Sequence, residues 1–498
     1  MISNRKIIVG NIIWIFGLFL FMFIWFSKVH PLVVYDADDW AYIAYARRAI
    51  PSIGEWNPAK LFPEIVLPFC ASLASRLIYP ITGEFINSIT LISAVVVSTF
   101  IVAYIQSLHG FLKRIFGLHD FTAILVELLF LIFHFLMFRE GDSNNTYLFY
   151  CDNLNCYYNY LMPALLNASL VLYMANNEKF YDFLEHGSVF TRGLFLVICY
   201  FAIFSNLVDN IILGVYAGCI LLFDLVKLLR KQIDVRKCVK NNWFHAGILA
   251  AWSVCAVFEM KGQRANVDIG DPRTFGQKLY MTLEGVFDMA SRMHKVFVLL
   301  VFLLIICAIG VYFFRGKKNK IDKAFVEQIG IWTFCSAVML VYVVLICAKV
   351  NSNNIWRIEY LFPFCFYLFM IVMIAFSYIL RNYEKVLVIV PLSLCVLCSF
   401  VNTNCNTFRE SNYSKVSGKT CMQISNEQVK QIVEADEQGI NSISLEVCLS
   451  DTIGNWPQTT YMGELMSRAL YKHGVISRPM EITIVPSEAL NMRYKIDQ

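Results

Sequence analysis

The chain has 498 residues, of which 58% are hydrophobic and only 16% are charged, and its formal net charge is +5. Soluble globular proteins carry about 25% charged residues, so this composition excludes a soluble chain with an ordinary polar surface. The net charge is too small, and too divided among separate loops, to indicate a nucleic-acid-binding protein.

The apolar residues form blocks of membrane-spanning length, about 17–25 residues each. The first block follows Arg5 and Lys6, and no small-residue cleavage site comes after it, so we interpret it as a retained span and not a signal peptide. Spans are predicted at about 7–28, 84–107, 121–138, 160–175, 190–205, 210–228, 243–259, 294–314, 329–348, 360–380 and 386–402. The prediction is therefore an all-α polytopic membrane protein with about eleven transmembrane helices.

The segment 61–80 is apolar but is not counted as a span. It carries Pro63, Glu64, Pro68 and Arg76, and a charge at mid-bilayer costs about 2.5–3.5 kcal/mol. We expect this segment to be interfacial or re-entrant.

The distribution of basic residues then predicts the topology. With the N-terminus in the cytoplasm, the densest basic runs all fall on the cytoplasmic side, as the positive-inside bias requires: Lys113-Arg114, the clusters in 227–240 and 315–320, and Arg381 with Lys385. The outer face then receives four polar loops, 29–60, 139–159, 260–293 and 349–358. The prediction is a multi-pass membrane domain over 1–402 followed by an extracytoplasmic C-terminus.

Residues 403–498 have the alternating helix, turn and strand patterns of a small soluble α/β domain. A helix is predicted near 426–437, where Gly439 ends it, and a strand follows at 442–448. A second helix is predicted near 461–473 and a last strand near 481–485.

Three carboxylates, Asp36, Asp38 and Asp39, stand a few residues beyond the first span. Carboxylates this close repel one another, so one of them can have a raised pKa and serve as a general base. The alternative interpretation is an acidic cap on a helix at 40–48, with Asp39 as the N-cap.

Residues 36–39 resemble the acidic motif in the first extracytoplasmic loop of GT-C glycosyltransferases, which are multi-span enzymes that use polyprenyl-phosphate sugars. The run from Trp40 to Tyr45 looks like the aromatic helix that continues this motif. The resemblance implies that these aspartates are catalytic and that Trp40 lines the substrate cavity.

The second outer loop contains Asp142 and Asp152, and it leads into the run Asn159-Tyr160-Leu161-Met162-Pro163. This run is similar to the Asn-Tyr-Leu-x-Pro helix start of serotype-converting O-antigen glucosyltransferases, although the Thr-Gly-Ser part of that pattern is absent here. The resemblance implies that the cavity is lined by Asp142, Asp152, Asn155 and Tyr160. The alternative is an aromatic belt with a proline near a helix start. Cys151 and Cys156 either form a disulfide on an oxidising face or remain free.

Basic side chains follow in the third and fourth outer loops. The run from Glu259 through Lys261 to Arg264 resembles the Pro-Gly-x-x-Arg turn of the same enzymes, without its proline. Arg264 and Arg357 offer planar guanidinium groups for phosphate oxygens, so Arg264, Arg357 and Lys261 are the candidates for binding a donor phosphate. Each has a simpler interpretation: a headgroup-level anchor for the turn, and an ion pair with Glu359 for Arg357.

As a whole, the layout resembles an inverting GT-C hexosyltransferase of the bacterial inner membrane. The resemblance implies undecaprenyl-phosphate glucose as the donor, lipopolysaccharide O-antigen as the periplasmic acceptor, and a small flippase and a donor synthase as partners. Asp38, or Asp39 beside it, would accept the proton of the acceptor hydroxyl. No cofactor is expected, and no cysteine pair has convincing zinc spacing, so no metal site is predicted.

Two other functions remain open. A transporter or flippase of lipid-linked saccharides would use ionisable residues within the spans, and Glu127, His134 and Asp224 are the candidates. Such carriers often contain paired repeats, and none is visible in this sequence. An O-antigen polymerase would also have many spans and arginine-bearing outer loops, but it would not need acidic residues directly after the first span.

Overall fold

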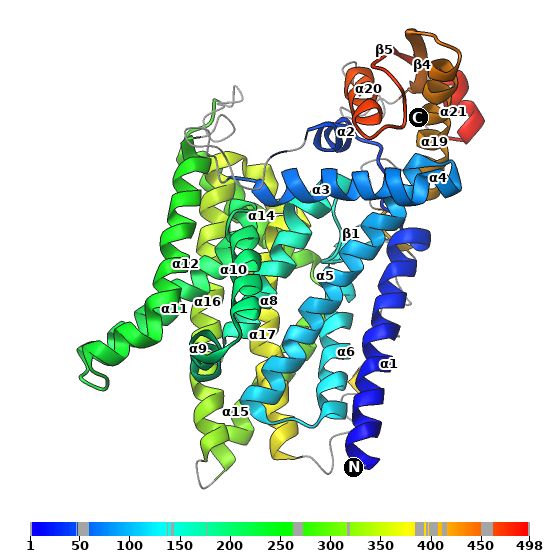
Figure 1. Cartoon of the computed structure of the whole chain (residues 1–498). Helices are drawn as coiled ribbons and strands as arrows, with labels where there is room; N and C mark the ends of the chain where they lie inside the picture. The colour runs from blue at the N-terminus through cyan, green and yellow to red at the C-terminus, as the bar shows by residue number, and fades with distance from the viewer. Residues whose placement is uncertain are drawn as a thin grey trace. The chain divides into compact units, whose positions relative to one another are not determined.

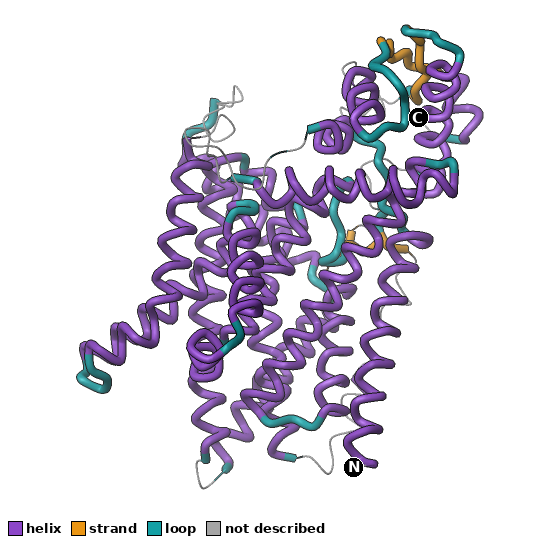
Figure 2. The backbone as a smooth tube through the Cα atoms, in the orientation of Figure 1, coloured by secondary structure: helices purple, strands orange, loops and turns teal. Residues whose placement is uncertain are grey.

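The computed structural model describes most of the chain. The described residues are 2–45, 47, 59–136, 138–140, 144–175, 177–261, 272–315, 319–383, 393–394, 397, 407–410, 416–449 and 462–496. The chain is mostly helical, and strands occur in only two places within this described part (Figure 2).

Eight helices of the described part are long and apolar enough to cross a membrane (Figure 1). They are Val9–Val29, Leu61–Thr82, α5 (Phe85–Phe116), α11 (Leu207–Leu229), α12 (Val235–Lys261), α15 (Lys295–Phe314), α16 (Lys320–Val350) and α17 (Ile358–Asn382). The first belongs to α1 (Ile2–Ile24) and the π-helical turn η1 (Trp25–Val29); the second is built from α3 (Leu61–Leu73), η2 (Ala74–Ile78) and α4 (Tyr79–Thr82). These lengths and compositions are those of a multi-pass membrane protein.

The count differs from the eleven predicted spans for identifiable reasons. Three predicted spans fold as shorter helices, α6 (Asp120–Leu136), α8 (Met162–Met174) and α10 (Val189–Ile203). The span predicted at 386–402 lies outside the described residues except for 393, 394 and 397. Conversely, Leu61–Thr82 has the length and composition of a span, yet α3 runs across the direction of the first half of α5, which suits the interfacial position predicted for it (Figure 1).

Chain contacts divide the molecule into two compact units. Unit 1 contains Met1–Ile15, Ala103–Tyr150 and Pro163–Arg409, and unit 2 contains Phe16–Val102, Cys151–Met162 and Glu410–Gln498. The predicted domain boundary at 402–403 falls on residues outside the described part.

Unit 1 is organised around α17, the most deeply buried of the candidate spans. It packs against α6, α11, α15 and α16. Buried tyrosine hydroxyls on α17 find partners on neighbouring helices: Tyr367 donates to the Ile212 carbonyl at 2.6 Å and Tyr378 donates to Asp322 at 2.5 Å. Such pairing is required because an unsatisfied polar group inside an apolar bundle is costly.

The remaining elements of unit 1 are short or peripheral. They are the helices α9 (Asn177–His186) and α14 (Phe275–Arg292), the 3-10 turn η4 (Ser352–Trp356), and a three-stranded sheet in the order β1 (Phe138–Glu140), β2 (Asn144–Thr146), β3 (Thr407–Phe408). The β1–β2 pair is antiparallel and the β2–β3 pair is parallel.

Unit 2 joins the end of α1, the first half of α5 and three short helices near them. These are α2 (Ala37–Ala44), α7 (Leu154–Cys156) and the π-helical turn η3 (Tyr157–Leu161). The extended segment before α2 is pinned to α5, because the Thr90 hydroxyl donates to the Leu32 carbonyl at 2.6 Å. η3 is held against α5 by a hydrogen bond of 3.0 Å between Tyr158 and Ser93.

The C-terminal part of unit 2 is the small strand-and-helix region expected from the sequence. It consists of α19 (Gly418–Glu437), β4 (Ser442–Cys448), α20 (Met462–Lys472), β5 (Glu481–Ser487) and α21 (Glu488–Tyr494), with β4 and β5 paired in parallel. α20 packs against α2, where Lys472 donates to the Ala44 carbonyl at 2.9 Å and His473 donates to the Ile43 carbonyl at 3.1 Å. These basic groups therefore satisfy the carbonyls at the C-terminal end of α2.

The close approach of α20 to β5 requires glycine at 463. A Cβ at Gly463 would lie 2.1 Å from the Ile482 carbonyl oxygen. We predict that Gly463→Ala destabilises the C-terminal region by about 1–3 kcal/mol through overpacking, measured as faster limited proteolysis of 418–496. Gly330→Ala on α16 is the control, because nothing lies within 4 Å of a Cβ at that position; equal protease resistance of both variants would contradict this packing.

Candidate functional site

The candidate site starts at the N-terminus of α2, where two aspartates form a capping box. Asp36 is the N-cap, and its Oδ1 accepts from the Asp38 amide at 2.7 Å. Asp39, three residues on, accepts from the Asp36 amide with its Oδ2 at 3.2 Å. The reciprocal bonds satisfy amides at the helix start that have no partner within the helix.

Asp39 also connects two segments that are far apart in the sequence. Its Oδ1 accepts from the Asn155 amide on α7 at 2.6 Å, and its Oδ2 accepts a further bond from the Tyr35 amide at 3.2 Å. The Tyr35 hydroxyl donates to the Asp152 carbonyl at 2.7 Å. The predicted first and second outer loops therefore meet at a shared set of hydrogen bonds within unit 2.

Asparagine side chains form most of the hydrogen bonds on the α7 and η3 side of this contact. Asn153 is the N-cap of α7, and its side chain accepts from the Cys156 amide at 2.9 Å. Asn159 donates to the Asn155 carbonyl at 3.1 Å and accepts from the Tyr42 hydroxyl of α2 at 3.3 Å. Tyr35 and Tyr42 were not predicted as site residues, because their partners lie 117 positions away and no local pattern marks them.

The electrostatics of the site follow from its burial. Asp36 and Asp39 have no exposed surface. Burial, strengthened by repulsion from Asp38 and Asp152, raises the pKa of Asp36 to about 6 even though the Asp38 amide opposes the rise. Burial and the neighbouring Asp36 charge also hold the pKa of Asp39 well above its usual range.

The three predicted catalytic aspartates are not equivalent. Asp39 uses both oxygens to accept three backbone amides. Asp36 uses only Oδ1, and its buried Oδ2 accepts no well-oriented hydrogen bond from the described residues. Asp38 is exposed. The alternative prediction that Asp39 is the N-cap is wrong: Asp36 occupies that position and Asp39 completes the capping box.

The predicted cavity-lining residues are brought together but are largely packed. Trp40 is 1% exposed, and Asp152 and Asn155 are each 6% exposed. Tyr160 is half-buried in η3. Asp142 lies outside the described residues. Cys151 and Cys156 do not form a disulfide, which decides between the two alternatives for this pair.

The predicted phosphate-binding residues belong to unit 1 or are not described. Arg357 donates from Nε to Glu359 at 2.8 Å and stacks on Tyr360, 5.5 Å from the ring centroid, so the ion pair considered from the sequence is present. Lys261 is the exposed last residue of α12. Arg264 lies outside the described residues.

A further buried carboxylate, Asp209, was missed by the sequence reasoning. It lies in the first turn of α11, has no exposed surface, and neither of its oxygens has a hydrogen-bond partner among the described residues. The carboxylate of Glu359 is near enough to repel a negative charge on Asp209. Asp209 stands three residues after the N-cap Asn206, in the first turn, where acidic residues are common. The sequence therefore gives no indication that it is buried.

Within the described ranges, no three His, Cys, Asp or Glu side chains converge as metal ligands.

The pKa of Asp36 generates a prediction about stability. Because its pKa in the folded chain lies near 6 and its ordinary value is 3.8, this carboxyl favours folding below about pH 4, and that contribution is lost as the pH rises through about 6. Asn is an equally good N-cap, so Asp36→Asn should flatten the pH dependence of unfolding between pH 4 and 6. The gain at neutral pH should be up to about 3 kcal/mol, at about 1.36 kcal/mol per pKa unit.

The measurement is the unfolding midpoint of the purified full chain from pH 4 to 8. Asp38→Asn is the comparison variant: Asp38 is exposed on the same helical turn and only adds repulsion to the burial that raises the pKa of Asp36, so it should reduce the slope less than Asp36→Asn does. A wild-type slope in Asp36→Asn would show that Asp36 titrates normally.

Comparison with known protein families, with curated proteins and with solved structures finds no match for this chain. The α2–α7 site is therefore interpreted from its own residues and geometry.

Proposed function

We propose that this protein is an inverting glycosyltransferase that moves a sugar, glucose by the resemblance of its motifs, from a polyprenyl-phosphate donor to a surface polysaccharide such as O-antigen. The observation that carries the proposal is the buried Asp36 carboxyl, which begins a helix seven residues beyond the span Val9–Val29 and whose Oδ2 accepts no well-oriented hydrogen bond from the part of the chain that the structure describes. A buried, perturbed carboxylate of this kind is more often functional than a surface acid.

In the proposed reaction Asp36 is the general base. A group whose pKa is near 6 is well matched to accept a proton near neutral pH. The acceptor hydroxyl gives its proton to Asp36 Oδ2 while its oxygen bonds to the anomeric carbon of the donor sugar. The bond from that carbon to the phosphate oxygen breaks, and the phosphate leaves on its lipid. Asp36 has no exposed surface in this structure, so the acceptor hydroxyl reaches Oδ2 only when the residues packed over it move aside.

Asp39 is a positioning residue in this proposal. Its carboxylate already accepts three backbone amides, so it is poorly placed to take a proton from a substrate. Its role is to fix the start of α2 against α7. The geometry thus favours Asp36 over Asp38 and Asp39 as the proton acceptor.

The donor phosphate would be held by basic side chains, and Arg264, Arg357 and Lys261 remain the candidates. Arg357 is partly neutralised by Glu359, a residue that is 3% exposed. Arg357 would therefore bind phosphate while it also bonds Glu359. Its guanidinium group has five N–H donors, which is enough for both partners. The proposed setting is the bacterial inner membrane with the site on the periplasmic side, supplied by a flippase and a donor synthase.

A carrier of lipid-linked saccharides is the second candidate, and Asp209 is the observation that favours it. Ionisable groups buried within spans mark transport pathways and proton relays. The three carrier residues considered from the sequence each have a hydrogen-bond partner: Glu127 accepts from Trp14, His134 donates to the Phe130 carbonyl and Asp224 accepts from Lys227.

The transferase proposal predicts a sharp difference among three isosteric variants. Membranes containing the full chain are supplied with radiolabelled polyprenyl-phosphate glucose and acceptor polysaccharide. Asp36→Asn should lower transfer at least 100-fold, since general-base catalysis contributes about 10²–10⁴-fold, whereas Asp38→Asn should retain most of it. Asp39→Asn should lose activity together with thermal stability, because it weakens the bond to Asn155.

Equal transfer by Asp36→Asn and the wild type, at equal protein levels, would remove the base assignment. Movement of the labelled lipid across sealed vesicles without a new glycosidic bond would identify the carrier instead, and Asp209→Asn should then abolish that movement.

The proposed site also requires the aspartates and Arg264 to face one compartment. Single cysteines at Asp38 and Arg264, in a chain whose other exposed thiols are blocked, should react with a membrane-impermeant maleimide from the same side. Lys113→Cys is the control and should react from the opposite side, as the positive-inside topology predicts. Labelling of positions 38 and 264 from opposite sides would exclude a shared pocket.

A further inference from the structure

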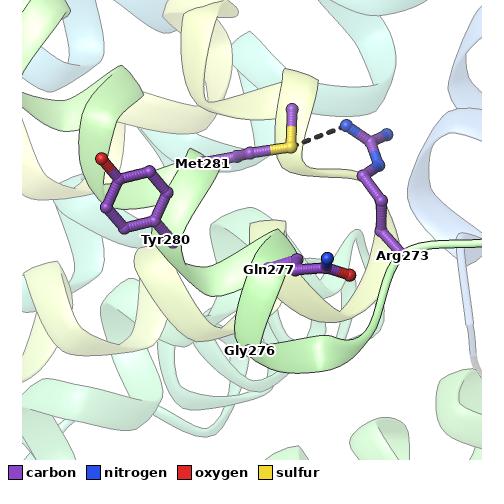
Figure 3. Close-up of a pocket in the computed structure, with 5 residues that line it drawn as sticks. All are labelled: Arg273, Gly276, Gln277, Tyr280 and Met281. Atoms are coloured by element: carbon purple, nitrogen blue, oxygen red, sulfur yellow. Dashed lines mark hydrogen bonds between the residues drawn. The ribbon is translucent and has the colours of Figure 1, made fainter.

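Two polar features of unit 1 lie apart from the candidate site. The first is a cavity of about 370 Å³ at the start of α14, and it is lined by Arg273, Gly276, Gln277, Tyr280 and Met281 (Figure 3). The ionisable residues of this lining are an arginine and a tyrosine, whose charges change only well above neutral pH. The second feature is a chain of hydrogen bonds between α1, α5 and α6. It contains a histidine, the side chain whose charge ordinarily changes near neutrality.

His109 of α5 is the centre of this chain, in which it is joined to Glu127, Asp120 and Lys113; these four residues are called the His109 cluster. The His109 Nδ1 bonds Glu127 of α6, and its Nε2 lies 3.1 Å from Asp120 Oδ1 at the start of the same helix. Lys113, one turn further along α5, donates to that Asp120 oxygen at 2.6 Å. The adjacent Arg114 is not part of the cluster, because it donates to a carbonyl of α8 at 2.8 Å.

The two carboxylates of the cluster also hold α1 in place (Figure 1). Trp14 donates from Nε1 to Glu127 at 2.7 Å, and Asn11 donates to Asp120 at 3.1 Å. Both donors belong to the first part of Val9–Val29, which is the least buried of the eight candidate spans, with 17% of its apolar window buried. Because so little of this span is packed, its two bonds to carboxylates make a substantial contribution to its attachment.

The hydrogen-bond pattern identifies the charge of His109. A neutral imidazole has one N–H group, and an ionised carboxylate can only accept. Both ring nitrogens of His109 are paired with carboxylates, so both bonds form together only when the ring is an imidazolium. A proton placed on Glu127 would satisfy the same bond, but an imidazole is a stronger base than a carboxylate. The cluster is therefore an imidazolium and a lysine balanced by two carboxylates.

Glu127 depends on the proton of His109. It has no exposed surface, and a buried carboxylate without a positive partner is costly. Lys113 does not replace the imidazolium, because it bonds Asp120, which stands seven residues before Glu127 on α6. Trp14 and Gln106 would remain as neutral donors to Glu127. Loss of the proton therefore favours entry of water to Glu127, and α1 is the least packed of the helices that cover it.

The exposure of the cluster decreases from one end to the other. The side chains of Lys113, Asp120, His109 and Glu127 are 42%, 19%, 12% and 0% exposed. A proton can therefore reach His109 from the Lys113 end, which the predicted topology places in the cytoplasm. Chains of His, Asp and Glu side chains within membrane domains are the groups that proton relays use.

We propose that the His109 cluster is a proton-binding site, whose proton enters from the Lys113 end and holds α1 against α5 and α6. With the proton bound, the ring donates to Glu127 and Asp120 together. When water accepts the proton, the ring keeps one N–H group and one of these bonds is lost, so Glu127 becomes solvated and α1 detaches. The site does not involve the carboxylates at α2 or the proposed transfer reaction.

The test follows the bond between Trp14 and Glu127 by NMR of the indole N–H groups, with the nitrogen-15-labelled full chain in lipid nanodiscs. The chain has nine tryptophans, and the Trp14 signal is assigned by its loss in Trp14→Phe. Between about pH 5 and about pH 9, the range in which a histidine changes charge, the wild-type signal should move from its bonded to its solvated position. The ratio of attached to detached α1 should fall by about tenfold or more, the effect of one charge-assisted hydrogen bond.

Two substitutions of His109 should remove this pH dependence in opposite directions. His109→Gln carries no charge, so the Trp14 signal should stay at its solvated position throughout. His109→Arg is always charged, so the signal should stay at its bonded position. His186→Gln is the matched control and should behave as the wild type, because His186 also pairs with an aspartate but on the exposed surface of α9, at 3.0 Å from Asp182.

Two results would overturn the proposal. A wild-type Trp14 signal that is constant over the whole pH range would show that the cluster is a fixed structural ion pair. A wild-type pH dependence that persists in His109→Gln would show that another group binds the proton. Neither result bears on the transfer reaction, because neither measurement involves a sugar donor.

Discussion

The bond between the Asp39 carboxylate and the Asn155 amide is the constraint on which the site depends. It joins two segments 116 residues apart, at 2.6 Å and between two buried residues. A buried carboxylate is costly unless its oxygens are satisfied, and Asp39 meets this requirement with three backbone amides, two from Tyr35 and Asp36 just before its own helix and one from α7. Because all three donors belong to the backbone, the position of α2 relative to α7 is fixed by main-chain geometry and not by flexible side chains.

The same bonds leave the Asp36 carboxylate with fewer hydrogen-bond donors than Asp39 has. The three amides go to Asp39 and the Asp38 amide goes to Asp36 Oδ1, so few donors remain for Oδ2. Desolvation then has no full compensation, which is why the pKa of Asp36 rises to about 6. The site therefore contains one carboxylate whose two oxygens accept three backbone amides beside one whose Oδ2 accepts no well-oriented hydrogen bond from the described residues. Repulsion from Asp38 and Asp152 adds to the effect of burial on the pKa of Asp36.

Those parts of the fold that depend on local pattern could be predicted from the sequence. The strand predicted at 442–448 is β4, and seven predicted spans coincide with long apolar helices. The α2–α7 contact could not be predicted, because its donor is a backbone amide, which every non-proline residue has. The burial of Asp36 and Asp39 could not be predicted either, because acidic residues directly after a span are typical of a solvated helix cap. The sequence predicts only a polar loop at 260–293, whereas the structure has the helix α14 at Phe275–Arg292.

The starts of α2 and α14 differ in how their positive ends are neutralised. At α2 the cap and the third residue are both aspartates, so the chain supplies its own anions at this helix end. At α14 the corresponding positions are Thr274 and Gln277, which satisfy the amides through hydrogen bonds but add no charge. The two capping boxes thus have the same hydrogen-bond pattern and opposite electrostatic consequences. Carboxylates that cap a helix and are also buried, as at α2, combine a favourable helix dipole with a large desolvation cost, and the raised pKa of Asp36 shows that desolvation is the larger effect.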